Sequence, residues 1–412
     1  MEKRYTYLII GGGIAGTTAA EAIRAADPAG SLGIVSDEPY RLYSRIMLSK
    51  PNFFLEKIPF ENVWLKKEDW FKENSIDFIG GKTAISLDTA GHRITLNDGT
   101  ALVYEKLLIA QGGSARKFPG PGGDKKGIFV IRTLDDAKAI IEATKKAKHA
   151  IVVGGGFVSF EMCEMLRLAN IDVTLILREN IFWHVLLDDT SGRIIEDALI
   201  RGGVTIVREA EVQEFTGGDT VTGAVLKNGD TLECDMAIVG IGIVMNLDWV
   251  KKARVAVRRG ICANEYLETN AADVWVAGDI AEYKDVILGE NLQLGNWVNA
   301  QMQGRCAGKG MTGKREPFRL VSFYTTQGFG TTIAFVGDVC MAPDRVILAR
   351  GSRERAAYAR IIVWNGRIIG ASLINRTQDL APLSRLIEKG VVVAGDEEKI
   401  KDPAFNLASL LN

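Results

Sequence analysis

Two stretches of the chain share one hydropathy pattern: a continuous apolar run, a cluster of glycines, and then apolar residues at helical spacing. They read TYLIIGGGIAGTTAAEAIRA from Thr6 and HAIVVGGGFVSFEMCEMLRL from His149. A short apolar run bounded by glycines is typical of a buried strand, and apolar residues three and four apart are typical of a helix. A further apolar strand follows each helix, at 32–35 and at 173–177. The pattern predicts two βαβ units, each opening a doubly wound α/β domain.

The two stretches form an internal repeat with a constant offset of 143 residues. The match extends beyond the glycines to charged positions, since Glu21 corresponds to Glu164 and Arg24 to Arg167. Because both copies keep the order strand, glycine turn, helix and strand, we expect two similar nucleotide-binding halves in one chain.

The first copy carries a complete dinucleotide fingerprint. Gly11 permits the tight turn, Gly13 lets the backbone approach a pyrophosphate at the helix N-terminus, and Gly16 lets the helix pack against the strand. Asp37, with Glu38 beside it, follows the next strand, where a carboxylate accepts hydrogen bonds from ribose hydroxyls. The first half is therefore expected to bind a dinucleotide.

The second copy departs from this fingerprint in two places. Ser159 replaces the third glycine, and the following strand ends in Leu177 and Arg178 instead of an acid. A small residue still permits helix packing, and an arginine at that point can bind the 2′-phosphate of a nucleotide. This favours NADPH over NADH, with a solvated strand-end arginine as the alternative.

Turn signals divide the remainder of the chain. Two-residue hairpin turns between apolar runs are predicted at Asp98 with Gly99, Asn228 with Gly229, and Asn365 with Gly366. The first two are expected to close small antiparallel sheets, one late in each nucleotide-binding half. The third lies in a tail beginning near Pro317, where IIVWNGRIIGASLI predicts two paired strands and 380–389 predicts a helix. This tail is expected to form a separate α+β domain.

Composition narrows the class of protein. The 412 residues contain 50 Lys plus Arg and 51 Asp plus Glu, so the net charge of −1 gives no whole-chain reason to expect nucleic acid or an anionic membrane. Three histidines and five widely spaced cysteines argue against a metal site or a disulfide framework. No apolar stretch approaches the ~20 residues that span a bilayer. We expect a soluble, cytoplasmic protein without a metal.

Four signatures in order carry a family resemblance: GGGIAG at 11–16, YSRIMLSK at 43–50, GGGFVSFE at 154–161 and VWVAGD at 274–279. The sequence resembles the FAD-dependent pyridine nucleotide oxidoreductases of the glutathione-reductase-like fold. It is most similar to their rubredoxin reductase, ferredoxin reductase and nitrite-reductase-flavoprotein branch.

The resemblance implies an α/β fold of two Rossmann-like FAD- and NAD(P)-binding domains of the three-layer ββα type, with a smaller C-terminal α+β domain. The expected boundaries are 1–117 with 236–316 for FAD, 118–235 for NAD(P), and 317–412 for the C-terminal domain.

The same resemblance assigns roles around the flavin. Asp279 is expected to bind the ribityl chain, Arg45 the pyrophosphate, and Trp297 to lie near the pyrimidine end, while Lys50 and Glu161 form a catalytic pair beside flavin N5. From the residues alone, Asp279 is also consistent with a helix N-cap, Lys50 with a surface lysine, Glu161 with an acid favoured by the helix dipole, and Trp297 with a core tryptophan.

The remaining expected contacts fall into two sets. The FAD set adds Ile14, Ala15, Ser36, Ala84, Ala110, Gly112 and Gly278 to the residues named above. The nicotinamide nucleotide set comprises Gly154, Gly156, Phe157, Val158, Ser159, Arg178 and Gly242.

The chain also lacks features of the resembled family. No cysteine precedes Met162, so neither a redox-active disulfide nor a single redox cysteine lies in the first half. The family's ATG is replaced by Ala110, Gln111 and Gly112, and its FWSDQ by the FYTTQ of 323–327. The second change alters the aromatic wall expected near the flavin and leaves the electron acceptor open.

Three functions follow as hypotheses. The leading one is a reductase that passes hydride from NAD(P)H to FAD and then electrons to a small carrier such as rubredoxin or ferredoxin. The alternatives are an NAD(P)H oxidase that uses O2, and a nucleotide-binding redox sensor or scaffold with little turnover. Homodimer formation is left open. A run of five arginines at 345–360 predicts either a basic docking patch for an acidic redox protein or a solvated face.

Overall fold

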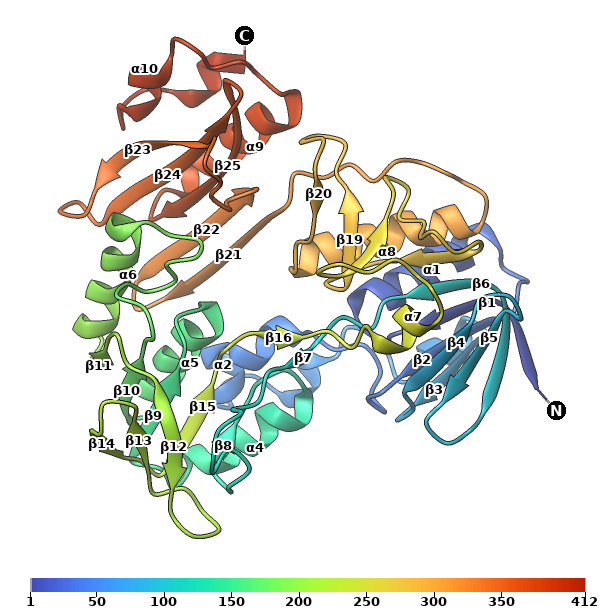
Figure 1. Ribbon diagram of the computed structural model, residues 1–412, viewed down its shortest axis with the longest axis horizontal. Coiled ribbons are helices and arrows are strands. Elements are labelled where there is room, and N and C mark those ends of the chain that lie inside the picture. The colour runs from blue at the N-terminus through green and yellow to red at the C-terminus, as the bar shows by residue number, and fades with distance from the viewer. Residues whose placement is uncertain (1, 412) are drawn as a thin grey trace. The chain divides into compact units, whose positions relative to one another are not determined.

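The computed structural model describes residues 2–411, which form two compact units. One unit combines residues 2–44, 62–114 and 244–322, and the other combines 45–61, 115–243 and 323–411. Each unit is therefore built from segments far apart in the chain, as the colours of Figure 1 show. The three-domain boundaries expected from the sequence stay a prediction.

The first unit is centred on a seven-stranded sheet. Its strands run in the order β3-β2-β1-β6-β5-β4, and β18 also pairs with β6. The strands β3, β2, β1, β6 and β18 are parallel, whereas β4 and β5 are antiparallel additions. Their bounds are β1 (Lys3–Ile10), β2 (Leu32–Ser36), β3 (Ile76–Gly80), β4 (Ala84–Asp88), β5 (Arg93–Leu96), β6 (Ala101–Ile109) and β18 (Val274–Val276).

Two helices of this unit pack with almost no side chain between them. They are α1 (Ile14–Ala26) and α8 (Trp297–Met311). A Cβ on Gly304 would lie 2.1 Å from the carbonyl oxygen of Ala15, so only glycine fits there. The unit is completed by η2 (Phe60–Val63), which begins in the other unit, and by α3 (Trp70–Glu73), α7 (Asp248–Lys252) and the small sheet of β17 (Ile261–Ala263), β19 (Ala281–Lys284) and β20 (Asn291–Leu292).

The second unit contains the other copy of the repeat. Its parallel sheet has the order β11-β10-β9-β15-β8, and a three-stranded antiparallel sheet β12-β13-β14 follows it in the chain. The strands are β8 (Ile128–Phe129), β9 (His149–Val153), β10 (Asp172–Ile176), β11 (Val204–Val207), β12 (Val212–Thr216), β13 (Gly223–Leu226), β14 (Thr231–Glu233) and β15 (Met236–Val239). The short β7 (Ser114–Ala115) and β16 (Ile243–Val244) pair with each other where the chain passes from one unit to the other. The helices are η1 (Arg45–Ser49), α2 (Pro51–Phe54), α4 (Leu134–Thr144), α5 (Phe157–Leu168) and α6 (Asp189–Arg201).

The C-terminal part of this unit is an antiparallel sheet in the order β21-β22-β25-β24-β23 (Figure 1). The hairpin expected at Asn365 and Gly366 is confirmed, since both residues have positive φ between β24 and β25. The bounds are β21 (Phe323–Gly328), β22 (Thr331–Gly337), β23 (Val346–Ser352), β24 (Ala357–Trp364), β25 (Arg367–Ile374), η3 (Thr377–Asp379), α9 (Leu380–Lys389), α10 (Glu397–Lys401) and η4 (Leu407–Leu411).

The predicted fold class is confirmed by this architecture. Both glycine turns join a buried parallel strand to a helix, and the helix expected at 380–389 has those bounds. It buries Leu383, Leu386 and Ile387 at helical spacing and ends at Gly390 with φ +59°. The other two predicted hairpins join β5 to β6 and β13 to β14.

The run of five arginines is not a basic patch, and that prediction is wrong. Arg350 and Arg360 are each 2% exposed, and the side chain of Arg345 is 7% exposed. Arg353 is exposed but forms an ion pair with Asp197 on α6. These guanidinium groups fix loops within the second unit, because strand alternation turns several of them inward.

Candidate functional site

Most of the residues expected to bind FAD gather at one edge of the large sheet in the first unit, whereas Arg45 and Lys50 belong to the second unit. The carboxyl ends of parallel strands meet at one edge, which is where α/β sheets bind ligands. Gly11 follows β1, Ser36 ends β2, Ala110 follows β6 and Gly278 follows β18. The amide of Ala110 donates to the carbonyl of Ile10 at 2.7 Å, which ties two of these strand ends together.

The turn after β1 shows why each glycine is needed. Gly11 has φ +123°, and a Cβ there would lie 2.3 Å from the Ala110 oxygen. A Cβ on Gly16 would lie 1.9 Å from the Gly11 oxygen, so α1 touches the turn. A Cβ on Gly13 would meet no atom of the chain within 4 Å. The space over Gly13, at the N-terminus of α1 where Ile14 and Ala15 begin the helix, fits a pyrophosphate.

Other expected FAD residues flank this turn. Ser36 is buried and Asp37, directly beyond it, is exposed. The Lys82 amide donates to the Ser36 carbonyl at 2.9 Å, which brings the start of β4, including Ala84, to the end of β2. Gly112 has φ +64° in the segment after β6.

Asp279 and Trp297 complete the expected set in the first unit. Asp279 follows β18, and the chain turns directly into β19, so the interpretation of Asp279 as a helix N-cap is wrong. The Gly278 amide donates to Oε1 of Gln303 at 2.8 Å, which fixes α8 to the strand end. Trp297 is the first residue of α8 and is half-buried, so it is not a core tryptophan. The contacts of both residues with a flavin stay predictions.

Ser159 fits into the second glycine turn because the adjacent residue after β15, Gly240, has no side chain. Ser159 is fully buried, and a Cβ on Gly240 would lie 2.6 Å from its Oγ. Gly154 has φ +111°, and a Cβ on Gly156 would meet no atom of the chain within 4 Å. The second turn therefore keeps an open space over Gly156, as the first turn does over Gly13.

The remaining nucleotide residues lie around this turn. Phe157 and Val158 open α5, and Phe157 is 40% exposed. Gly242, with φ +99°, follows β15, which is the parallel neighbour of β9.

Arg178 has a partner that sequence reasoning missed. Its Nε and Nη2 donate to Oε1 of Glu179 at 2.9 and 2.6 Å, and this contact raises the pKa of the guanidinium. The Arg178 side chain is 69% exposed. The fingerprint expects its acid at the strand end, at Leu177. Glu179 offers a carboxylate two residues further on.

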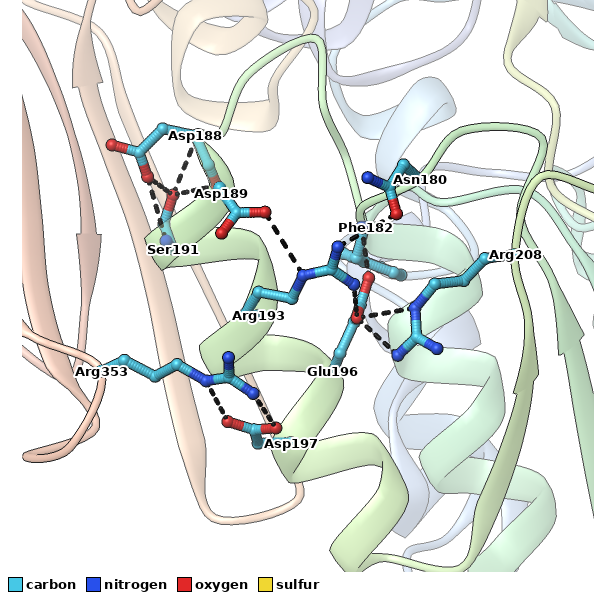
Figure 2. Close-up of polar contacts among 10 residues, drawn as sticks. All are labelled: Asn180, Phe182, Asp188, Asp189, Ser191, Arg193, Glu196, Asp197, Arg208 and Arg353. Carbon is cyan, nitrogen blue, oxygen red and sulfur yellow. Dashed lines mark hydrogen bonds and ion pairs between the residues drawn. The ribbon is translucent and has the colours of Figure 1, made fainter.

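The loop that carries Arg178 is fixed to the neighbouring helix. Figure 2 shows the Glu196 carboxylate of α6 between the guanidinium groups of Arg193 and Arg208. Glu196 is 1% exposed and also accepts the Phe182 amide at 2.8 Å. A buried carboxylate held by two arginines and an amide fixes the start of the loop.

The C-terminal sheet fixes the other end of the same loop. Arg360 and Ser372 both donate to the carbonyl of Leu186, at 2.9 and 3.1 Å. The Tyr358 hydroxyl donates to Asp188 at 2.7 Å. The C-terminal domain thus positions the segment that follows β10.

Lys50 and Glu161 form the ion pair expected from the sequence, although their place beside a flavin stays a prediction. Lys50 directly precedes Pro51 of α2, and Glu161 lies on α5 and is 5% exposed. Ser49 Oγ donates to Oε2 of Glu161, while Lys50 Nζ and Thr326 Oγ1 donate to Oε1. Lys50 Nζ also donates to Thr326 Oγ1 at 3.2 Å. Lys50 is therefore not an isolated surface lysine.

Neighbouring residues define the surroundings of this ion pair. Arg45, in η1, donates to the carbonyl of Arg132 at 2.7 Å.

The Tyr324 ring stacks on Phe335 with centroids 5.2 Å apart, and its hydroxyl has no hydrogen-bond partner in the described part of the chain. Burial, and to a lesser extent the charge of Glu161, raises the pKa of Tyr324 well above its usual value.

A cavity of about 690 Å³ opens beside the ion pair. Its rim is exposed at Asn52, Thr325, Gln327 and Gly330. The lining consists of Lys50, Pro51, Asn52, Glu164, Thr325, Thr326, Gln327, Gly328, Gly330, Thr331 and Thr332. Water in this cavity has access to the Lys50 side chain, which is 30% exposed.

The cysteines do not form a redox pair, since all five are free. Cys163 and Cys234 are buried, and burial raises the pKa of Cys234 to about 12. Cys262 and Cys306 are half-buried and Cys340 is exposed. Among residues 2–411, no cluster of His, Cys, Asp and Glu side chains suits a metal ion, and no helix is long and apolar enough to cross a membrane.

Two dinucleotide turns on separate parallel sheets, followed by an antiparallel C-terminal sheet, define an oxidoreductase that binds two nucleotide cofactors. Residues 5–304 match the pyridine nucleotide-disulphide oxidoreductase family, and residues 323–411 match the reductase C-terminal family. The chain belongs to the pyridine nucleotide-disulphide oxidoreductase family. This membership implies FAD and a nicotinamide nucleotide as cofactors.

Relatives of similar length carry ferredoxin reductase names. The chain is 28% identical over 406 residues to the biphenyl dioxygenase system ferredoxin–NAD(+) reductase component of Paraburkholderia xenovorans, covering 98% of each chain. It is 29% identical to the 5,5'-dehydrodivanillate O-demethylase ferredoxin reductase subunit of a Sphingobium species, covering 98% of this chain and 97% of that one. A ferredoxin reductase structure from Rhodopseudomonas palustris matches with a TM-score of 0.88 at 25% identity, covering 98% and 99% of the two chains.

Proposed function

We propose that the protein passes hydride from NAD(P)H to FAD and then electrons, one at a time, to a small carrier such as a ferredoxin or rubredoxin. The observation that carries this proposal is the pair of open glycine turns, at Gly13 and Gly156, in a chain whose five cysteines are all free. Electrons therefore leave without passing through a protein disulfide. The full-length similarity to named ferredoxin reductases supports a protein carrier as the acceptor.

The chain's own residues bind and orient the cofactors in this proposal. The α1 N-terminus over Gly13 holds the FAD pyrophosphate, and the Asp279 carboxylate holds the ribityl chain. The family resemblance assigns the Arg45 guanidinium to the same pyrophosphate. The turn at Gly156 holds the nicotinamide nucleotide. Bound FAD supplies the hydride acceptor and the one-electron donor. Lys50 and Glu161 act on the flavin as an ion pair in which the carboxylate is buried and the ammonium is 30% exposed.

Anaerobic stopped-flow absorbance tests this function. The FAD-loaded protein is mixed with NADH and, separately, with NADPH, and then with air or with an oxidised ferredoxin. Fast bleaching of the flavin band and slow recovery in air, accelerated by the ferredoxin, is the expected result. Fast recovery in air alone supports the oxidase, and absence of bleaching with either nucleotide overturns the reductase in favour of a sensor.

We further infer a preference for NADPH, set by Arg178. We expect Arg178→Gln to raise the KM for NADPH about tenfold, the loss of ~1.4 kcal/mol, and to leave the KM for NADH within twofold. Glu179→Gln frees the guanidinium and should lower the KM for NADPH. Steady-state kinetics with both nucleotides measure this, with the exposed Arg201→Gln as the control. A wild-type preference for NADH that Glu179→Gln abolishes would assign the ribose to Glu179 instead.

The cellular location and the assembly state are also proposals. We place the protein in the cytoplasm because its five thiols are free, as a reducing compartment keeps them. The active form in this proposal is the single chain, and a homodimer through the C-terminal domain is the alternative. Light scattering of the FAD-loaded protein distinguishes the two by mass.

A further inference from the structure

The hydrogen bonds around Glu161 lead from a buried carboxylate to a solvent cavity within the second unit. Thr326 is 3% exposed, lines the cavity, and its hydroxyl both accepts from Lys50 and donates to Glu161. A hydroxyl has one proton and two acceptor sites, so one acceptor site of Thr326 remains for water. Thr326 is therefore the hydroxyl that connects Glu161 to the cavity.

The proposed reaction requires a proton to leave. One NAD(P)H reduces two molecules of a one-electron carrier, giving NAD(P)⁺, two reduced carriers and one proton. The hydride brings both electrons and the hydrogen nucleus into the site, but the carriers remove electrons only. One proton per turnover must therefore pass from the buried site to water.

We propose that Thr326 passes this proton from Glu161 to water in the cavity. The inference rests on the proposed function, which places Glu161 beside the flavin. As the carriers remove the two electrons, the N–H bond that holds this proton on the reduced flavin breaks and an O–H bond forms on Glu161. The Thr326 hydroxyl then turns its own proton to a cavity water, which becomes hydronium, while the Glu161 O–H bond breaks and a new O–H bond forms on Thr326. Thr326 holds one proton before and after, and Glu161 returns to the carboxylate.

The Lys50 ammonium does not depend on Glu161 alone for stabilisation. When Glu161 is protonated, Lys50 loses its counter-charge, and a fully buried ammonium would then carry a large desolvation cost. The Lys50 side chain is 30% exposed and lines the same cavity, so water solvates its charge during the transfer.

Proton release by the holoenzyme can be followed without nucleotide or carrier. FAD-loaded protein is reduced by light with a sacrificial donor, then mixed with ferricyanide, a one-electron oxidant, in weak buffer containing a pH-indicator dye. Flavin absorbance reports oxidation and the dye reports the proton. In the wild type we expect the dye signal to accompany oxidation and to slow in D2O.

Three variants locate the path. Thr326→Val keeps the shape but removes the hydroxyl, and should slow the dye signal at least about tenfold. Thr326→Ser keeps the hydroxyl and should match the wild type. Thr325→Val is the matched control, because Thr325 lines the same cavity from the exposed face of β21.

The outcomes separate the two proposals. Three results would each overturn the Thr326 path. Thr326→Val could release its proton at the wild-type rate, Thr325→Val could slow proton release as much as Thr326→Val does, or the wild-type dye signal could keep its rate in D2O. If Thr326→Val does not hold FAD, a slow Thr326→Ser variant overturns it instead. Failure of NAD(P)H to bleach the wild type would refute the reductase alone, because light reduction needs no nucleotide.

Discussion

Gly13→Ala is expected to leave the protein folded and to abolish tight FAD binding. A Cβ at Gly13 meets no atom of the chain within 4 Å, and its φ of −75° suits any residue, so the apoprotein gains no strain. The added methyl occupies the space where the backbone must approach the pyrophosphate. We expect the dissociation constant for FAD to rise about 100-fold or more, a loss of ~3 kcal/mol. Fluorescence titration of the apoprotein with FAD measures it.

Three further glycine variants control this result. Gly156→Ala should weaken NAD(P)H binding and leave FAD bound, because its Cβ is equally unobstructed in the second turn. Gly16→Ala should lower the melting temperature of the apoprotein itself, since its Cβ would lie 1.9 Å from the Gly11 oxygen. Gly99→Ala, at a positive φ in open space, reports the cost of backbone strain alone. Wild-type FAD affinity in Gly13→Ala would refute the assignment of the first turn.

Arg350→Met is expected to cause the largest loss of stability among the arginine variants. The buried guanidinium donates to the Asp379 carboxylate and to the carbonyls of Ile400, Asp402, Pro403 and Phe405. Methionine fills part of the space but offers these acceptors no donor, and only Asp379 and Pro403 keep a hydrogen bond from Arg376. We expect the free energy of unfolding of the C-terminal domain to fall by about 3 kcal/mol or more, measured by urea denaturation.

Arg355→Met is the matched control for this change. Arg355 lies in the same run but is exposed, so its loss should change stability by less than about 0.5 kcal/mol. Equal effects of the two variants would show that burial does not distinguish these arginines. Neither outcome depends on cofactor binding, so the comparison tests the C-terminal fold by itself.

The sequence predicted those parts of the fold that depend on local pattern. The repeat, the glycine turns and the 380–389 helix follow from periodicity and from backbone requirements within one segment. The pairing of Lys50 with Glu161 came from the family resemblance, and the structure brings the two side chains together.

The parts that sequence reasoning missed depend on contacts between distant segments. Thr326 reaches Glu161 across 165 residues of chain, and Ser49 reaches it across 112, and no local pattern encodes either hydrogen bond. The departure from FWSDQ showed that 323–327 differ from the family, but it did not indicate that Thr326 contacts Glu161. Glu179 directly follows Arg178 in the sequence, but it lies beyond the strand end at which the fingerprint places its acid. The arginine run was misjudged because charge was counted without strand alternation.

The contact between α1 and α8 bears on how the protein is made in the cell. The first helix of the chain packs on one that ends at Met311, and β18 joins the same sheet from residues 274–276. A ribosome must therefore translate most of the message before the first Rossmann-like half can close. Until then the apolar strands of that half lack their final neighbours, and unpaired strands of this kind are prone to aggregation. We therefore expect FAD to bind only after the ribosome has made α8.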